Sequence, residues 1–111
     1  MTNRYLLALD GGATKTTMTI RTTEGRELFS ATSTSSNYQT VGTEHVQHVF
    51  TGLLRSAAAH LPKLHIDVAV FAVSGVDTNQ DKKIIAEIIE ESTARSPFTF
   101  GQILLENDAE A

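Results

Sequence analysis

The chain has no cysteine among its 111 residues, so disulfide bonds, thiolate zinc sites and cysteine nucleophiles are excluded within it. Basic residues are also few: 9 Lys and Arg stand against 13 Asp and Glu, which gives a net charge of −4. Nucleic-acid binding depends on clustered Lys and Arg, and those of this chain are scattered. The apolar run over residues 5–9 stops at Asp10, far short of a signal-peptide core or a membrane span. We therefore expect a cytoplasmic domain that contacts neither membrane nor nucleic acid.

The length suits a single domain, and the pattern of apolar residues predicts an α/β fold. Strands are predicted over residues 4–10, 15–22, 27–32, 67–73 and 102–105. A helix is predicted over residues 46–61, where apolar side chains recur at spacings of three and four, and a second helix after residue 78. The order strand, strand, strand, helix, strand, helix, strand favours a mixed five-stranded sheet, in which an antiparallel meander leads into parallel units.

Three local patterns add detail to this fold. The strand over residues 67–73 is continuously apolar after its aspartate, which predicts a strand buried on both faces by helices. Thr78, followed three residues later by Asp81, predicts a capping box at the start of the second helix. The polar stretch over residues 33–42 is predicted to be a surface loop.

The turn between the first two strands is unusually rich in polar residues. It reads Asp10, Gly11, Gly12, Ala13, Thr14, Lys15 and Thr16. Two glycines allow positive φ and let backbone amides converge on an anion without side-chain obstruction. The carboxylate supplies the hard oxygen that Mg²⁺ prefers, through a water molecule. A hairpin whose glycines serve only the turn is the alternative. Such a hairpin needs none of the carboxylate, hydroxyls or lysine, so the turn predicts a site for a nucleotide phosphate and Mg²⁺.

The element order and this turn together resemble the N-terminal half of the actin, Hsp70 and sugar-kinase superfamily, whose fold is ribonuclease-H-like. The likeness is greatest to the BadF/BadG/BcrA/BcrD-type ATPases and the N-acetylglucosamine kinases grouped with them. Residues 10–16 are similar to the first phosphate motif, except that Ala13 stands where the family often has a third glycine. The likeness covers essentially the whole chain but only half of such a protein. We therefore expect residues 1–111 to form the N-terminal actin-like ATPase subdomain, a fragment that lacks the second nucleotide-binding domain.

Three further segments carry the resemblance. Ser36–Asn37, with Gly42 ahead of the long helix, is similar to the loop whose asparagine touches the sugar in amino-sugar kinases, although this asparagine also suits an ordinary turn. Asn107–Asp108 after an apolar strand is similar to the segment whose aspartate is the catalytic base, although the pair also suits a helix cap. Ser74–Gly75 ends a parallel strand and resembles the loop that lines the cleft. Open α/β sheets bind ligands at the carboxyl ends of such strands.

The resemblance implies an enzyme that transfers a phosphoryl group from ATP to a hydroxyl of an amino sugar, N-acetylglucosamine or glucosamine, with Mg²⁺. It implies Asp10 as the Mg²⁺ ligand and Asp108 as the catalytic base that takes the proton of the sugar hydroxyl. The implied phosphate contacts are Gly11, Gly12, Thr14, Lys15 and Thr16, and the implied substrate contacts are Asn37, Ser74, Gly75 and Asn107.

Two other classes of function stay open. ATP-driven activators of 2-hydroxyacyl-CoA dehydratases belong to the same broad family, but they carry an iron–sulfur cluster on cysteines, which this chain lacks. A non-catalytic module of the same fold is the other class, and the presence of both Asp10 and Asp108 argues against it. The expected partner is a small-molecule sugar. A cleft face left uncovered by the missing half also favours self-association, up to a homodimer.

Overall fold

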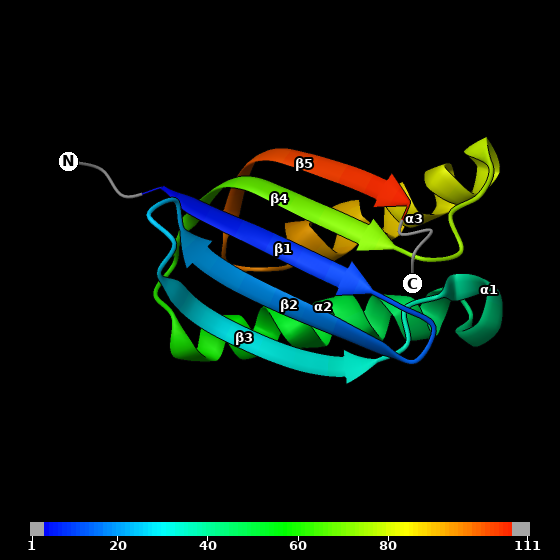
Figure 1. Ribbon diagram of the computed structural model, residues 1–111, viewed down its shortest axis with the longest axis horizontal. Coiled ribbons are helices and arrows are strands. Elements are labelled where there is room, and N and C mark those ends of the chain that lie inside the picture. The colour runs from blue at the N-terminus through cyan, green and yellow to red at the C-terminus, as the bar shows by residue number, and fades with distance from the viewer. Residues whose placement is uncertain (1–3, 108–111) are drawn as a thin grey trace.

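The computed structural model describes residues 4–107, which form an α/β fold around one mixed sheet. The strands are β1 (Tyr5–Gly11), β2 (Lys15–Thr22), β3 (Glu27–Thr34), β4 (His65–Val73) and β5 (Thr99–Asn107). The helices are α1 (Tyr38–Val41), α2 (Thr43–His60) and α3 (Asn79–Ala94). The sheet order is β3-β2-β1-β4-β5, antiparallel among the first three strands and parallel for β1–β4 and β4–β5 (Figure 1). The predicted meander leading into parallel units is confirmed.

Helices α2 and α3 pack together against one face of the sheet (Figure 1). Alternate residues of β1 and β4 point toward them, and Leu7, Leu9, Phe71 and Val73 are each 2 % exposed or less. Phe50 of α2 meets Phe71 with ring centroids 5.4 Å apart and planes tilted by 59°. An offset, tilted aromatic pair of this kind adds to the burial of the two rings. The hydrophobic core therefore lies between the sheet and the two long helices.

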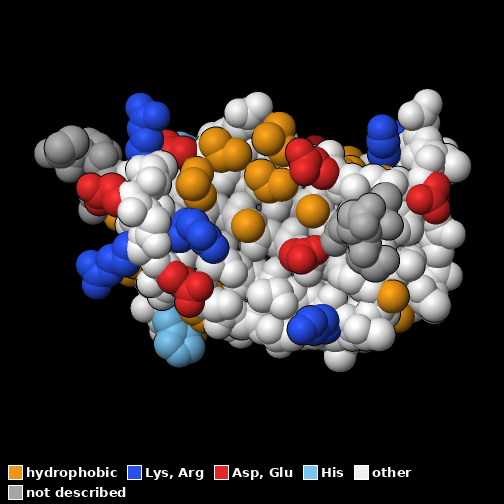
Figure 2. All heavy atoms as spheres, in the orientation of Figure 1, with side chains coloured by type: hydrophobic (Ala, Val, Ile, Leu, Met, Phe, Trp, Pro, Cys, Tyr) orange, Lys and Arg blue, Asp and Glu red, His pale blue; other side chains and the backbone are white. Residues whose placement is uncertain are grey.

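The opposite face of the sheet is not covered by any helix of residues 4–107. Val68, Val70 and Ala72 of β4 are only half-buried there, so the prediction that this strand is buried on both faces is wrong. Leu104 of β5, which is aligned with Val70, is 37 % exposed. Figure 2 shows apolar side chains gathered over the middle of this open face. An apolar run indicates that both faces of a strand carry apolar side chains, but it does not indicate which element covers each face.

The segment over residues 33–42 is ordered rather than a plain loop. Its first two residues extend β3 to Thr34, and its last part forms the short helix α1. Asn37 caps α1, because its Oδ1 accepts a hydrogen bond of 3.1 Å from Gln39 N. Ser35 and Ser36 between these elements are buried. The prediction of a surface loop is therefore wrong here: polar composition reveals neither a local cap nor burial by distant parts of the chain.

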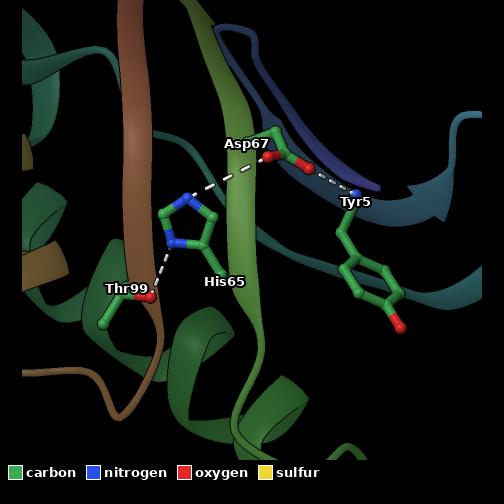
Figure 3. A network of polar contacts seen from close by, with 4 residues as sticks. All are labelled: Tyr5, His65, Asp67 and Thr99. Carbon is green, nitrogen blue, oxygen red and sulfur yellow. Dashed lines mark hydrogen bonds and ion pairs between the residues drawn. The ribbon is translucent and has the colours of Figure 1, made fainter. Parts of the chain in front are cut away.

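A bulge interrupts the pairing of β1 with β4 at the end where β1 begins. The register shifts between Tyr5 and Leu6, which leaves Asp67 unpaired in the ladder. The Asp67 carboxylate compensates, because its Oδ2 accepts a hydrogen bond of 3.1 Å from Tyr5 N (Figure 3). Its Oδ1 lies 4.0 Å from His65 Nε2, and His65 Nδ1 lies 2.8 Å from Thr99 Oγ1. These contacts join three neighbouring strands at this end of the sheet.

Among the described residues, no helix is both long and apolar enough to span a membrane.

Candidate functional site

The carboxyl ends of β1, β4 and β5 lie side by side at one end of the sheet. Gly11 is aligned with Val73, and Val73 is aligned with Asn107. The strands that end near Asp10, Ser74–Gly75 and Asn107 are therefore neighbours in the sheet. Asp108, the predicted catalytic base, lies outside the described residues. Figure 1 shows the β1–β2 turn and α1 at this same end, where ligands bind in open α/β sheets.

The β1–β2 turn is a tight hairpin with exposed polar side chains. Gly12 N donates a hydrogen bond of 2.8 Å to Lys15 O, which closes the turn. Neither Gly11 nor Gly12 has positive φ, so the backbone freedom expected of them is not used. Thr14 and Lys15 are exposed, whereas Thr16 is fully buried. The Thr16 hydroxyl donates to a β3 carbonyl at 2.8 Å, so this side chain fixes the turn onto the sheet.

Gly11 is needed because other segments approach it closely. A Cβ at this position would lie 2.0 Å from Ser36 Oγ and 2.9 Å from Val73 Cγ1. Ser74 N donates a hydrogen bond of 2.8 Å to Gly11 O. Since any larger residue would displace these neighbours, the glycine lets the β3–α1 and β4–α3 loops both rest on the end of β1.

Gly75 brings the Asn37 loop against the end of β4. Its φ is 85°, a conformation that favours glycine, and a Cβ there would lie 2.3 Å from Asn37 Oδ1. Gln39 Nε2 also donates a hydrogen bond of 2.6 Å to Gly75 O. The two segments that the family resemblance links to substrate, Ser36–Asn37 and Ser74–Gly75, are therefore in contact, although Asn37 and Gly75 are 38 positions apart in the sequence.

A carboxylate at the start of α3 anchors this arrangement. Tyr38 OH donates a short hydrogen bond to Asp81 Oδ1, and Asp81 Oδ2 accepts from Gln39 Nε2 at 3.3 Å. The same Oδ2 accepts from the backbone N of Asp77 and of Thr78, each at 3.0 Å, and the Thr78 side chain completes the predicted capping box. The Tyr38 hydrogen bond, helped by those from Asp77 and Thr78, holds the pKa of Asp81 below its usual range despite burial. The same bond raises the pKa of Tyr38.

Two buried hydroxyls and one exposed carboxylate define what the site offers a ligand. Ser36 Oγ and Ser74 Oγ are buried and have no hydrogen-bond partner among the described residues. Asp10 is exposed at the end of β1. Among residues 4–107 no group of three or more His, Asp or Glu side chains could enclose a metal ion. Mg²⁺ commonly binds through one or two carboxylates together with substrate phosphates and water, and a single carboxylate beside the exposed Thr14 and Lys15 side chains fits this mode of binding.

The sequence is similar to that of one curated kinase. Over 109 residues the chain is 29 % identical to the N-acetylmuramic acid/N-acetylglucosamine kinase of Clostridium acetobutylicum, covering 96 % of this chain and 34 % of that kinase. The chain therefore spans about a third of the length of this relative. A comparison with known protein families finds none that matches the chain.

Among the solved structures that share the architecture, three illustrate its range. A proposed N-acetylglucosamine kinase from Chromobacterium violaceum has a TM-score of 0.62 at 20 % identity, over 95 % of this chain and 35 % of that one. The ethanolamine utilization protein EutJ from Carboxydothermus hydrogenoformans has a TM-score of 0.69 at 11 % identity, over 96 % and 38 %. The PPX-GPPA enzyme of Aquifex aeolicus has a TM-score of 0.52 at 9 % identity, over 94 % and 36 %. The chain thus has the ribonuclease-H-like α/β fold of actin-like ATPase domains.

Proposed function

We propose that this chain is the N-terminal part of a sugar kinase, which transfers a phosphoryl group from ATP to a hydroxyl of an amino sugar such as N-acetylglucosamine. The observation that carries the proposal is the meeting of three loops at one end of the sheet. The polar turn after Asp10, the Asn37 loop and the Ser74–Gly75 loop come from distant parts of the sequence and contact one another there. The 29 % identity to an amino-sugar kinase supports the choice of acceptor.

The turn after Asp10 suits the ATP phosphates. Gly12 N is engaged within the turn, but the amides of Ala13 and Thr14 donate to no acceptor in the described part of the chain. The Thr14 hydroxyl and the Lys15 ammonium are exposed beside them. Phosphoryl transfer needs positioning and charge compensation more than covalent help, and these groups supply both. Mg²⁺ held by Asp10 would neutralise charge on the transferring phosphoryl group.

The Asn37 loop suits the sugar. Asn37 Oδ1 is used to cap α1, whereas its Nδ2 has no acceptor among residues 4–107 and can donate to a ring hydroxyl. The unpartnered Ser74 Oγ adds a hydroxyl at the same end of the sheet. In this proposal Asp108 accepts the proton of the attacking sugar hydroxyl, because it directly follows Asn107 at the end of β5.

The test is turnover by a full-length protein that carries this chain. With MgATP and N-acetylglucosamine we expect ADP release that depends on the sugar. Asp10→Ala should remove most of this activity, and Asp108→Asn should lower kcat by roughly 10² to 10⁴, the usual cost of a missing general base. Glu24→Gln, a carboxylate in the β2–β3 turn, is the matched control and should be silent.

Three results would contradict the proposal in different ways. ADP release without sugar dependence would favour an ATP-driven switch. An unchanged kcat with a raised KM for the sugar in Asp108→Asn would make Asp108 a binding group and place the base elsewhere. If ATP is bound between this chain and a second domain, the 111-residue chain alone should bind MgATP weakly and show no detectable turnover. Sustained sugar-dependent turnover by the 111-residue chain would contradict this expectation.

A further inference from the structure

A groove with several polar and charged lining residues lies between α2 and α3, and no residue of the candidate kinase site lines it. Its larger part, of about 250 Å³, is lined by Gln47, His48, Thr51, Gly52, Arg55 and Arg95. A second hollow of about 170 Å³ shares Thr51, Arg55 and Arg95 with the first and reaches Ser92. The shared residues show that the two hollows are adjacent, and together they are called the α2–α3 groove.

Two arginines that line this groove have no acidic side chain within 4.0 Å of their guanidinium nitrogens among residues 4–107. Arg55 of α2 and Arg95 at the end of α3 are exposed, and within residues 4–107 the only ion pair within 4.0 Å is His65–Asp67. Glu91 lies four residues before Arg95, the C-cap of α3, at a spacing that allows opposite charges on a helix to pair. Its carboxylate instead accepts a hydrogen bond of 2.8 Å from Gln47 Nε2. Both guanidinium groups therefore keep their hydrogen-bond donors available, in a chain whose net charge is −4.

Two residues that line the same groove carry buried hydroxyls. Thr51 Oγ1 and Ser92 Oγ are inaccessible and lack a hydrogen-bond partner among the described residues, and Ser92 as a whole is 1 % exposed. A helical Ser or Thr commonly satisfies its hydroxyl on the carbonyl four residues earlier. The neighbouring Thr93 does so, donating to Ile89 O at 2.8 Å. A buried hydroxyl without such a bond is costly unless another acceptor completes it.

Gly52 keeps the groove open. It lies in the interior of α2, where glycine is among the least favourable residues. A Cβ at this position would have no atom within 4 Å, so no close packing requires the glycine. Any side chain there would instead project into the space beside Thr51 and Arg55.

We propose that the α2–α3 groove binds a phosphate group, either as inorganic phosphate or as the phosphoryl end of a small phosphomonoester. Guanidinium groups pair with phosphate oxygens through charge-assisted, often bidentate hydrogen bonds, and Arg55 and Arg95 supply two such groups. Thr51 and Ser92 carry nearby hydroxyls, and each can donate to a ligand oxygen once its side chain turns toward the groove. Sites for drug-sized molecules usually exceed about 300 Å³, and each hollow is smaller than this, at about 250 and 170 Å³, so each suits a small anion. This inference does not depend on the proposed kinase reaction, since it uses none of the same residues.

The test is a titration of the ¹⁵N-labelled chain, followed by NMR at constant ionic strength, with inorganic phosphate in one series and glycerol 1-phosphate in another. We expect saturable shifts at the amides of Thr51, Gly52, Ser92 and Arg95. Arg55→Gln and Arg95→Gln should each weaken binding at least tenfold. Lys63→Gln, which removes an exposed charge outside the groove, is the matched control and should leave the affinity unchanged.

A third variant separates shape from charge. Gly52→Leu keeps both arginines and a residue that favours helix, but it fills the groove and should abolish the saturable shifts. Tighter binding of glycerol 1-phosphate than of inorganic phosphate would identify a phosphomonoester as the ligand, and the reverse order would identify the free ion. Linear shifts of equal size in every variant, or saturable shifts centred on residues 11–16, would overturn the proposal.

Discussion

The two faces of the sheet have similar apolar character but different surroundings. On the face under α2 and α3, Leu7, Leu9, Phe71 and Val73 are essentially inaccessible. On the other face of the same strands, Leu6, Val68, Val70 and Ala72 are only half-buried and Ala8 is exposed. Burial of apolar area is the main stabilising contribution to folding, so the covered face should dominate stability. The open face contributes less and leaves an apolar surface in contact with water (Figure 2).

The largest expected difference compares two adjacent residues of β4 that point to opposite faces. Phe71→Ala should destabilise the chain by about 3–5 kcal/mol, because it removes a buried ring and its contact with Phe50. Val70→Ala, on the open face, should cost about 1 kcal/mol or less, because its side chain is already partly in water. Urea unfolding followed by circular dichroism measures both free energies. Similar losses for the two variants would mean that the open face is as well packed as the covered one.

A smaller effect concerns Asp81, at the start of α3 on the covered face, whose contribution to stability should depend on pH. The Tyr38 hydrogen bond lowers the pKa of Asp81 in the folded chain. A lowered folded-state pKa contributes stability above the unfolded value, about 3.9, and this contribution is lost as the pH falls through the folded-state pKa. Asp81→Asn should therefore be less stable than the parent at neutral pH, and the gap should narrow as the pH falls below about 3.9.

The control for this pH effect is Glu87→Gln, which removes an exposed carboxylate from the same helix. Its stability should follow that of the parent chain at every pH. The difference in free energy of unfolding between Asp81→Asn and the parent could instead stay constant from neutral to acid pH. That result would contradict the prediction that ionised Asp81 stabilises the fold more than protonated Asp81 does.

The sequence predicts the strands and long helices well because their signals are local. The strand over residues 15–22 has the predicted bounds, and Thr78 and Asp81 form the predicted capping box. Each signal depends on neighbouring side chains or on one helical turn, which a sequence pattern records directly. The adjacency of β1, β4 and β5 follows from the order of these elements.

The loops around the candidate site are harder to predict, because their structure comes from contacts between distant residues. Tyr38 and Asp81 are 43 positions apart, and nothing in the sequence near Tyr38 indicates their hydrogen bond. Gly11 is expected for its backbone freedom, yet the structure needs it because Ser36 lies so close. The local pattern also fails to predict that helices cover only one face of the sheet, because the apolar sequence of β4 would be the same with a helix on each side.

The smallest expected change in stability lies on the open face, where the main effect should be on self-association. Exposed apolar patches promote association, and Leu104 at 37 % exposure is one of two large apolar residues of the described chain that remain exposed. Leu104→Lys should change the free energy of unfolding by about 0.5 kcal/mol or less, as surface substitutions usually do. Sedimentation velocity over a range of concentrations should show the parent chain associating and the Leu104→Lys variant staying closer to monomer.

The control is Thr19→Lys, which adds the same charge to the same face of the sheet but at a polar position, on β2 beside Ala8. If Thr19→Lys reduces association as much as Leu104→Lys, net charge rather than the apolar surface controls it. If the parent is monomeric at every concentration, the open face does not drive association at all.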